Sequence, residues 1–460
     1  MTARLRKLLY ALGNAFWLLP AAMVILGILS AFALIAVDRS GLISSRILQG
    51  NWLYNGGGTG ARTLLGAVAA STIGVAGTVF SITIAALSLA AGQMGPRLLQ
   101  NFTRDRGNQI TLGAFLGTFS YAMMVLRSVR TQSEGEFVPH LALSVGILLA
   151  FFCVATLVFF VGHMAGRINV DSVIDLVGTE VRKAIARLTV ADPEPAPPPA
   201  SFWLHSTEVV DDRRGYLQQL DADTLADWAA VNETAIRLLL RPGEYLFPGA
   251  VIALVTPAVE GAGVAIRDAT ALSSQRASSA DLESEIRQLV EVAVRALSPG
   301  INDPHTAMSV LDRLGAALCD VASVHLPTGV HLRNDRPALI VPSVNYDGLT
   351  DSMFHLIRQN AAGSAATLIR MLEVLTAVVG CEHDTTRRQS LQRHVDLIVD
   401  DAKRNIENPA DLADIRARHD NFATMMEHGA IGAVCGARPD PSDASTLWSR
   451  DRGWSQDRWL

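Results

Sequence analysis

Charge is missing from one long stretch of this sequence. Residues 64–92 contain no Asp, Glu, Lys or Arg over 29 consecutive positions. About 20 apolar residues are enough for a helix to cross the roughly 30 Å hydrocarbon core of a bilayer. We therefore predict a membrane-spanning helix here, and an entirely soluble chain is excluded.

Lysine and cysteine are also scarce. The three lysines are Lys7, Lys183 and Lys403, so residues 201–345 lack the side chain through which a biotin- or lipoyl-type carrier is loaded. The cysteines are widely separated and form no CxxC pair, which argues against a cysteine zinc site or a disulfide framework and fits a reducing cytoplasm. They are Cys153, Cys319, Cys381 and Cys435.

Motifs of known catalytic chemistry are absent from the sequence. No nucleophile elbow, Walker A loop, HExxH or dinucleotide-binding fingerprint occurs in its expected context. The histidines of the C-terminal half lack the i, i+4 spacing of paired metal ligands and are interpreted as core or solvent-facing residues. They are His325, His331, His355, His383, His394 and His419. We expect no enzymatic activity, no catalytic residue, no metal and no cofactor.

Charge is divided unevenly along the chain. Residues 1–166 carry 11 basic and 4 acidic groups, whereas the remainder carries 28 basic and 40 acidic groups. Nucleic-acid binding needs a basic face for the phosphates, so an acidic soluble part argues against that partner. The mean hydropathy of +0.26 fits a chain that is half membrane and half soluble.

Four apolar segments are predicted to span the membrane, at about 16–37, 64–92, 110–126 and 141–163. Basic residues precede the first segment, as in a signal peptide. Its 22 apolar residues are too many for a typical signal core, and further spans follow, so we interpret it as an uncleaved helix. The predicted fold is a four-span α-helical bundle, residues 1–166, joined to a cytoplasmic α+β domain with a helical C-terminal part.

Small and hydroxyl-bearing side chains recur along one stripe of the 64–92 helix, at alternating steps of three and four. Two interpretations stay open: close packing of helices through small residues, or an aqueous path lined by hydroxyl groups. A similar small-xxx-small pattern occurs in the next helix at Gly113, Gly117 and Ser120. The candidate path-lining residues are Ser71, Thr78, Ser81 and Ser88.

Basic residues near the helix ends predict the orientation. Nine lie on the side of the N-terminus, the 94–109 turn and the segment after the fourth span, against five on the other side. This bias places both termini and the soluble domain in the cytoplasm of a bacterial inner-membrane protein. Arg127 and Arg130 then lie at an outer mouth, where they either attract anions or pair with Glu134 and Glu136.

Beyond the spans, residues 167–190 are predicted to form a connecting helix whose apolar stripe packs on a sibling subunit or on its own domain. The Pro-rich residues 191–200 form a stiff linker. An α+β domain follows at 201–345, a helical subdomain at 346–430 and a flexible Trp-containing tail at 431–460. Within the α+β domain we expect strands at 202–210, 214–220 and 245–255, and helices at 222–240, 281–297 and 311–324.

The densest polar cluster of the soluble part is the turn at 298–306. Capping explains these residue types, because Pro299-Gly300 ends one helix while Asn302 or Asp303 caps the next. The alternative is a functional turn that binds an anion through free helix-start amides or a cation through acidic and imidazole groups. Its candidate residues are Ser298, Asn302, Asp303 and His305.

Two blocks of this sequence resemble a known family. The first runs from Gly77 to Arg130 and includes Gly95-Pro96-Arg97-Leu98-Leu99 and Arg104-Asp105-Arg106; the second is Ala296–Pro304 with Thr306-Ala307. Both are similar to bacterial predicted membrane proteins of the domain of unknown function 2254 family, over roughly residues 5–430. The resemblance implies a multi-span inner-membrane protein with a cytoplasmic domain, and it implies no activity.

Three functional classes are compatible with these features. A homo-oligomeric ion channel or passive solute transporter with a regulatory cytoplasmic domain is the first, and a membrane-anchored sensor or scaffold is the alternative. A membrane-bound enzyme ranks third. The expected partners are the lipid bilayer, further copies of the chain and a small ion or solute.

Overall fold

The computed structural model describes residues 16–40, 57–94, 105–130, 137–168, 170–274 and 282–435. The chain divides into two compact units, Met1–Val173 and Ile174–Leu460. The predicted tail repeat at Trp448, Trp454 and Trp459 lies outside the described residues.

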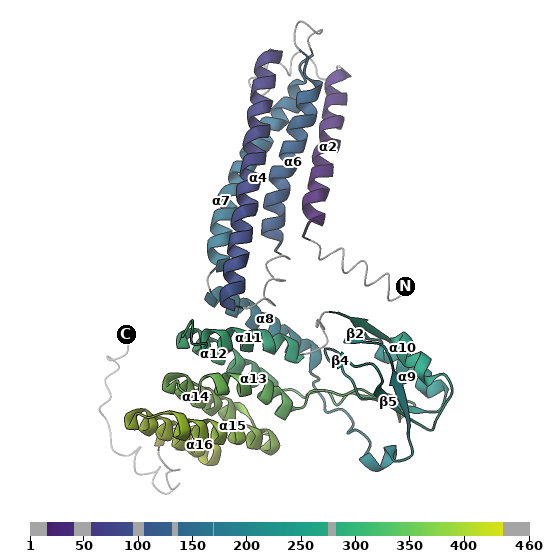
Figure 1. Ribbon diagram of the computed structural model, residues 1–460, viewed down its shortest axis with the longest axis vertical. Helices are drawn as coiled ribbons and strands as arrows, with labels where there is room; N and C mark the ends of the chain where they lie inside the picture. Colours follow the sequence, from purple (N-terminus) through teal and green to yellow (C-terminus); the bar gives the residue numbers. More distant parts are fainter. Residues whose placement is uncertain are drawn as a thin grey trace, which may run out of the picture. The chain divides into compact units, whose positions relative to one another are not determined.

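Within the described residues, the first unit is a bundle of four helices that run alternately in opposite directions (Figure 1). All four are long and apolar enough to cross a membrane, which confirms the predicted number of candidate spans. The apolar runs with few charges predicted where these helices lie, but the ends of the helices differ from the predicted ends by up to several residues. The helices are α2 (Leu18–Arg39), α4 (Gly58–Met94), α6 (Arg106–Ser128) and α7 (His140–Ile168).

Helix α6 lies at the centre of the bundle and packs against α2, α4 and α7. In its most apolar stretch 56% of the residues are buried, compared with 17–22% in the other three helices. It contacts α2 backbone to backbone: a Cβ atom on Gly27 would lie 2.5 Å from the Gly117 carbonyl oxygen, and one on Gly117 would lie 3.0 Å from the Met23 carbonyl oxygen. The small-xxx-small pattern of α6 therefore serves close helix packing.

Polar contacts fix the helices at the end of the bundle where α7 begins. The carboxylate of Asp38, on α2, accepts hydrogen bonds from the backbone N–H groups of Leu141 and Ala142 at 3.2 and 3.0 Å. These groups have no partner within their own helix, and a negative charge is favourable at a helix start. The Tyr121 hydroxyl, from α6, donates to the Ala142 carbonyl at 2.6 Å.

Helix α8 (Val170–Leu188) crosses the boundary between the units, and its apolar stripe is buried. Within the second unit, Gly178 lies against the side chain of Arg313, and Arg313 forms an ion pair with Asp175. Side chains of the stripe are buried in the single chain, as packing on the protein's own domain predicts. Packing on a sibling subunit stays a prediction.

The second unit contains two sheets. The larger has the strand order β1-β5-β3-β8-β7 and is antiparallel except where β3 pairs with β8; the smaller has the order β4-β2-β6. The short helix η3 (Ala200–Trp203) precedes them. The strands are β1 (Thr207–Asp211), β2 (Gly215–Leu220), β3 (Ala235–Leu238), β4 (Tyr245–Leu246), β5 (Ala250–Thr256), β6 (Thr270–Ser273), β7 (Val330–Arg333) and β8 (Arg336–Ile340).

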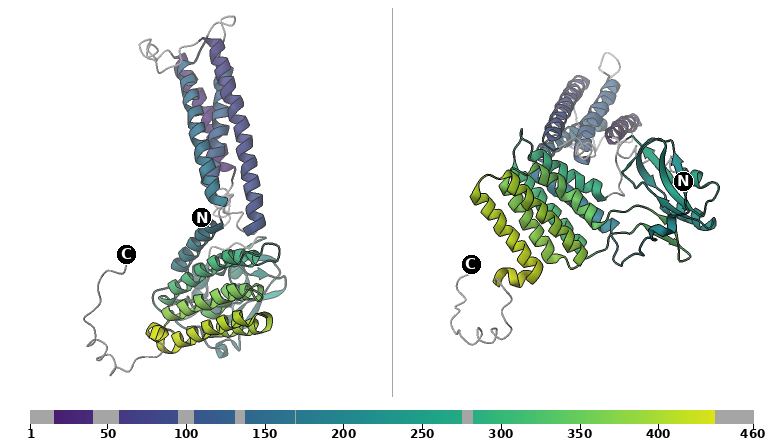
Figure 2. Two further views of the ribbon diagram at one scale, coloured as in Figure 1. Left: turned by 90° about the vertical axis from the view of Figure 1, so that its left-hand side faces the viewer. Right: turned by 60° about the horizontal axis from the view of Figure 1, so that its bottom comes forward.

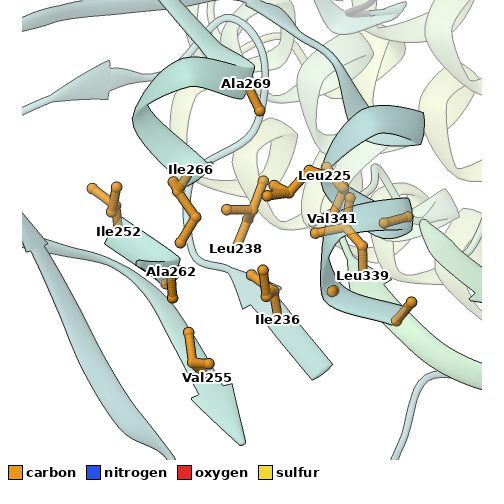
Figure 3. Close-up of a cluster of buried hydrophobic side chains, with 14 of the residues drawn as sticks. Leu225, Ile236, Leu238, Ile252, Val255, Ala262, Ile266, Ala269, Leu339 and Val341 are labelled. Atoms are coloured by element: carbon orange, nitrogen blue, oxygen red, sulfur yellow. The ribbon is translucent and has the colours of Figure 1, made fainter. Parts of the chain in front are cut away.

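The core of this α/β region lies between the larger sheet and two helices, α9 (Ala222–Val231) and α10 (Ala262–Ala269). Figure 3 shows Leu225 of α9 and Ile266 of α10 close to Ile236 and Leu238 of β3, with Leu339 of β8 beside them. Complete burial of such side chains contributes about 1.5–3 kcal/mol each.

Six helices form the remainder of the second unit. Helices α11, α13 and α15 pack in succession, as do α12, α14 and α16, and α12 lies against α11. Figures 1 and 2 show them as a stack of roughly parallel rows. They are α11 (Leu282–Ala296), α12 (Pro304–Ala322), α13 (Tyr346–Asn360), α14 (Ala365–Cys381), α15 (Thr385–Asn405) and α16 (Pro409–Cys435).

Several local predictions differ from the structure. The segment predicted as a helix at 222–240 is helical only to Val231, and residues 235–238 form β3. The predicted strand at 202–210 begins as the helical turn η3, and the strand at 245–255 is interrupted at Gly249, whose φ is +79°. Helices α11 and α12, which were assigned to the α+β domain, pack in the helical stack.

We expect Gly27→Leu to destabilise the bundle by about 1–3 kcal/mol, because the new side chain must displace the α6 backbone. The matched control is Gly162→Leu on α7, where a Cβ atom would meet no described atom within 4 Å. Unfolding of the purified protein in mixed micelles of increasing SDS content measures the difference. Equal unfolding midpoints for Gly27→Leu and the wild type would contradict the close approach of α2 and α6.

Candidate functional site

The hydroxyl stripe of α4 faces away from its own bundle. Ser71, Thr78, Ser81 and Ser88 are all exposed in the single chain. The first three hydroxyls donate to carbonyls of their own helix, at 3.1, 3.2 and 2.9 Å. A Cβ atom built on Gly74, in the same stripe, would meet no described atom within 4 Å. Within one chain, nothing described seals this face.

The opposite side of α4 fills the bundle interior. It is buried and mostly apolar, with Leu65, Ala69, Thr72, Ala76 and Val79 at alternating steps of four and three. Side chains from the neighbouring helices fill the space between them, including Tyr121 of α6 and Phe160 of α7, each at most 1% exposed. The described interior is thus a packed core, and the hydroxyl stripe lies outside it.

A close contact between a carboxylate and an imidazole, which sequence reasoning missed, lies at the end of the bundle where α6 begins. Asp105 caps α6 by accepting a hydrogen bond from the Gly107 N–H at 3.2 Å, and its other oxygen lies 2.6 Å from Nε2 of His163 on α7. A Cβ atom on Gly107 would lie 2.8 Å from that nitrogen, so only glycine leaves room for the imidazole ring. Nearby in the sequence, Asn108 is 2% exposed, and its amide has no hydrogen-bond partner among the described residues.

The 298–306 turn has the geometry of two helix ends. Asp303 accepts hydrogen bonds from the N–H of Thr306 at 3.1 Å and from the Thr306 hydroxyl at 2.6 Å, while the Ser298 hydroxyl donates to the Arg295 carbonyl. Asn302 has a positive φ of 49°, a conformation that asparagine tolerates better than most residues. The hydrogen bond from the Thr306 hydroxyl, acting against partial burial, holds the pKa of Asp303 below its ordinary value.

The other two candidate residues of this turn, Ser298 and His305, form no binding site with Asp303 among the described contacts. His305 is exposed, and Ser298 is used by its own helix end. Capping therefore accounts for the described contacts of the turn, and its use as a binding site stays a prediction.

Arg127 and Arg130 lie at the end of α6 and are exposed. The backbone of Arg130 pairs with that of Phe137 through two hydrogen bonds, which holds the start of the next segment. The predicted partners Glu134 and Glu136 fall outside the described residues, so neither interpretation of these arginines is tested.

Two of the six scattered histidines meet. His355 of α13 and His394 of α15 lie beside Asp351, and the potential ligand atoms of the three side chains are all within 4.8 Å of one another. Asp351 and His355 are spaced i, i+4, which places both on one face of α13. This i, i+4 spacing is visible in the sequence. It was missed because the spacing was considered only between two histidines and not between an aspartate and a histidine.

Two of the widely separated cysteines are neighbours in the structure. Cys319 of α12 and Cys381 at the end of α14 are free thiols, and Cys381 is the more exposed. Burial, together with the adjacent Cys381, raises the pKa of the Cys319 thiol to about 11.

Comparison with known proteins identifies the family. The sequence profile of a family of predicted membrane proteins, the domain of unknown function 2254, matches residues 13–377. The chain belongs to this family. The block around Asp105 and the second block, 296–307, both lie within the matched range.

Curated relatives of this family member include uncharacterized proteins of Mycobacterium tuberculosis and Mycobacterium bovis. Each is 29% identical over 480 residues, which cover 98% of this chain and 89% of the relative. No solved structure matches the chain significantly. The family description supports a membrane protein, and the names of the relatives assign no activity.

We expect Asp303→Ala to lower the free energy of unfolding by about 0.5–2 kcal/mol, because the α12 cap is lost. Asp303→Asn keeps a cap oxygen and is the matched control. Since the pKa of Asp303 is lowered on folding, its contribution is present at neutral pH and is lost as the pH falls through the lowered pKa, below about 4. Thermal melts of the detergent-solubilised protein between pH 3 and 7 measure both effects. Loss of function in Asp303→Ala with unchanged melting would instead favour a binding turn.

Alkylation should distinguish the two neighbouring thiols. The thiolate is the reactive form, so at pH 8 we expect iodoacetamide to modify Cys319 more slowly than the exposed Cys381. The rate at Cys319 should continue to rise towards pH 11. Peptide mass spectrometry reports each site separately, and equal rates at pH 8 would show that Cys319 is not shielded in this way.

Proposed function

We propose that this protein assembles in the bacterial inner membrane as a homo-oligomer and forms a pathway for a small ion or solute. The hydroxyl stripe of α4 faces water along that pathway, and the second unit regulates it from the cytoplasmic side. The observation that carries the proposal is the two-sided surface of α4, whose inner side fills the bundle while its hydroxyl stripe stays uncovered.

The packed interior supports a pathway between chains rather than through one chain. Large apolar side chains occupy the described interior of the bundle. An uncovered stripe on a peripheral helix becomes the inner wall when several copies surround a common axis, and cyclic assembly is the usual form of a homo-oligomer.

The composition of the outer surface of α4 supports the choice of face. Ile73, Phe80 and Ile84 are 42–48% exposed and lie on a third side of the helix, where large apolar groups suit contact with acyl chains. The hydroxyl stripe consists of small and hydroxyl-bearing residues, and the exposed Ile82 lies at its edge. Small residues allow helices to approach, and the hydroxyls remain available to water in addition to their bonds to the helix.

The distribution of basic residues supports the orientation. More basic residues lie on the side of the N-terminus, the 94–109 turn and the segment after the fourth span than on the opposite side. The positive-inside rule therefore assigns this side to the cytoplasm. Both termini and the acidic second unit are then cytoplasmic.

A membrane-anchored sensor or scaffold is the second candidate. The observation that favours it is that Ser71, Thr78 and Ser81 already bond to their own helix, so the stripe can be buried against protein without any loss of hydrogen bonds. In that case the same face joins subunits and leaves no path.

Cysteine accessibility tests the proposal. In a background without the four native cysteines, we expect cysteines at Ser71, Thr78 and Ser81 to react with a membrane-impermeant thiol reagent in vesicles, because this face meets water. The matched controls are Ala69→Cys, on the packed side, and Phe80→Cys, on the lipid side, which should stay unmodified.

The same vesicles allow conductance to be measured after fusion with planar bilayers. A pathway predicts single-channel currents that reagents at Thr78→Cys or Ser81→Cys reduce at least about tenfold, since the modification fills the path. Unreactive stripe positions together with an absence of conductance would refute the pathway and favour the scaffold.

A further inference from the structure

The interface between α13 and α15 carries a series of polar contacts, one of which is incomplete. At one end Ser390 donates to Asp347, and at the other Arg358 forms an ion pair with Asp401. Between them lie Asp351 and His355 of α13 and His394 of α15. Each outer contact joins a donor to an acceptor, although Nε of Arg358 has no described partner. The middle group leaves three imidazole nitrogens without hydrogen-bond partners among the described residues.

His394 is the centre of this group. Its side chain is fully buried, and neither ring nitrogen has a hydrogen-bond partner in the described part of the chain. Nδ1 of His355 is likewise buried without a partner there. A buried polar atom without a hydrogen bond is costly and needs a reason.

Two of the distances among the three side chains are close to those between ligands of one ion, and all the potential ligand atoms lie within 4.8 Å of one another. Nε2 of His394 lies 3.2 Å from Oδ1 of Asp351, without hydrogen-bond geometry, and Nδ1 of His355 lies 3.7 Å from the same oxygen. Ligand atoms about 2.0–2.1 Å from a tetrahedral zinc ion are roughly 3.3 Å apart. We propose that Asp351, His355 and His394 bind a divalent transition-metal ion, of which Zn²⁺ is the representative.

The chemistry of the ligands agrees with this class of ion. Imidazole and carboxylate together suit zinc and related transition metals, whereas calcium and magnesium prefer sites made of oxygen atoms. Burial lowers the pKa of His394 to about 4, which keeps its ring neutral and able to donate a lone pair at neutral pH. Three protein ligands leave a coordination position for water, as in exchangeable or catalytic sites rather than closed structural ones.

Nearby positive charge sets a limit on the affinity. The guanidinium of Arg393 lies 2.6 Å from Oδ1 of Asp351, and Arg358 is close enough to act on His394. Arg358 is neutralised by Asp401, and the side chain of Arg393 is 43% exposed, so water screens its charge. The carboxylate can thus bind an ion and an arginine together, as ligating carboxylates commonly do. We expect weaker binding than at a closed four-ligand zinc site.

Metal titration of the full-length protein tests this site. The protein is purified in detergent without a histidine tag, stripped with EDTA and titrated with Zn²⁺ by calorimetry, with Co²⁺ absorption as a second readout of nitrogen ligation. We expect one ion per chain in the wild type. Asp351→Asn and His355→Ala should weaken binding at least about tenfold, while the matched control His419→Ala, in α16, should bind as the wild type does.

Thermal unfolding provides an independent readout. An ion shared by α13 and α15 stabilises the folded state, so Zn²⁺ should raise the Tm of the wild type and of His419→Ala but not that of His355→Ala. The side chain of His355 is 41% exposed and Asp351→Asn keeps its shape, so both variants are expected to fold. A wild type that binds no Zn²⁺, or variants that bind it equally well, would overturn the proposal. Neither result depends on whether the protein conducts ions.

Discussion

The close approach of α2 and α6 determines the arrangement of the membrane unit. Three glycines, Gly27, Gly113 and Gly117, remove the side chains that would otherwise separate the two backbones. Because α6 then has neighbours on several sides, its large residues fill the interior, and α4 is left at the periphery. The exposure of the hydroxyl stripe is a consequence of this packing, since a helix at the edge of a bundle can bury only one of its sides.

Sequence reasoning located the four spans because an apolar run of about 18 residues or more with few charges is typical of a membrane helix. The ends of the helices required local chemistry instead: α6 begins four residues before the predicted position because Asp105 caps it. In the second unit, the error at 222–240 arose because a short apolar run fits both a buried helix and a buried strand. Glu233, with a positive φ of 50°, ends the helix there, and β3 follows in the centre of the sheet.

The polar groups of the two units show a different limit of sequence reasoning. Asp105 and His163 are 58 residues apart in the sequence. His355 and His394 lie in α13 and α15, and the whole of α14 separates them in the sequence. A single helix repeats every 3.6 residues, so its pattern can place Asp351 beside His355 but cannot indicate which distant helix completes the group. By contrast, the 298–306 turn is local, and capping was predictable from its residues alone.

Energetic cost distinguishes the middle group of the α13–α15 interface from ordinary packing. An apolar residue of similar size at position 394 would fill the space beside Phe354 without orphaned nitrogens, whose burial costs about 1–3 kcal/mol each. The same helical stack pairs Asp347 with Ser390 and Arg358 with Asp401. It also leaves single atoms of Tyr346, Arg358 and Glu382 without a described hydrogen-bond partner, but at His394 both ring nitrogens are left and potential ligand atoms of Asp351 and His355 lie beside them. The proposed ion would offset this cost, because it would take up imidazole lone pairs that no described donor reaches. The same reasoning does not extend to the buried amide of Asn108, because the described part of the bundle contains no cluster of three histidine, cysteine or carboxylate side chains whose ligand atoms lie close together.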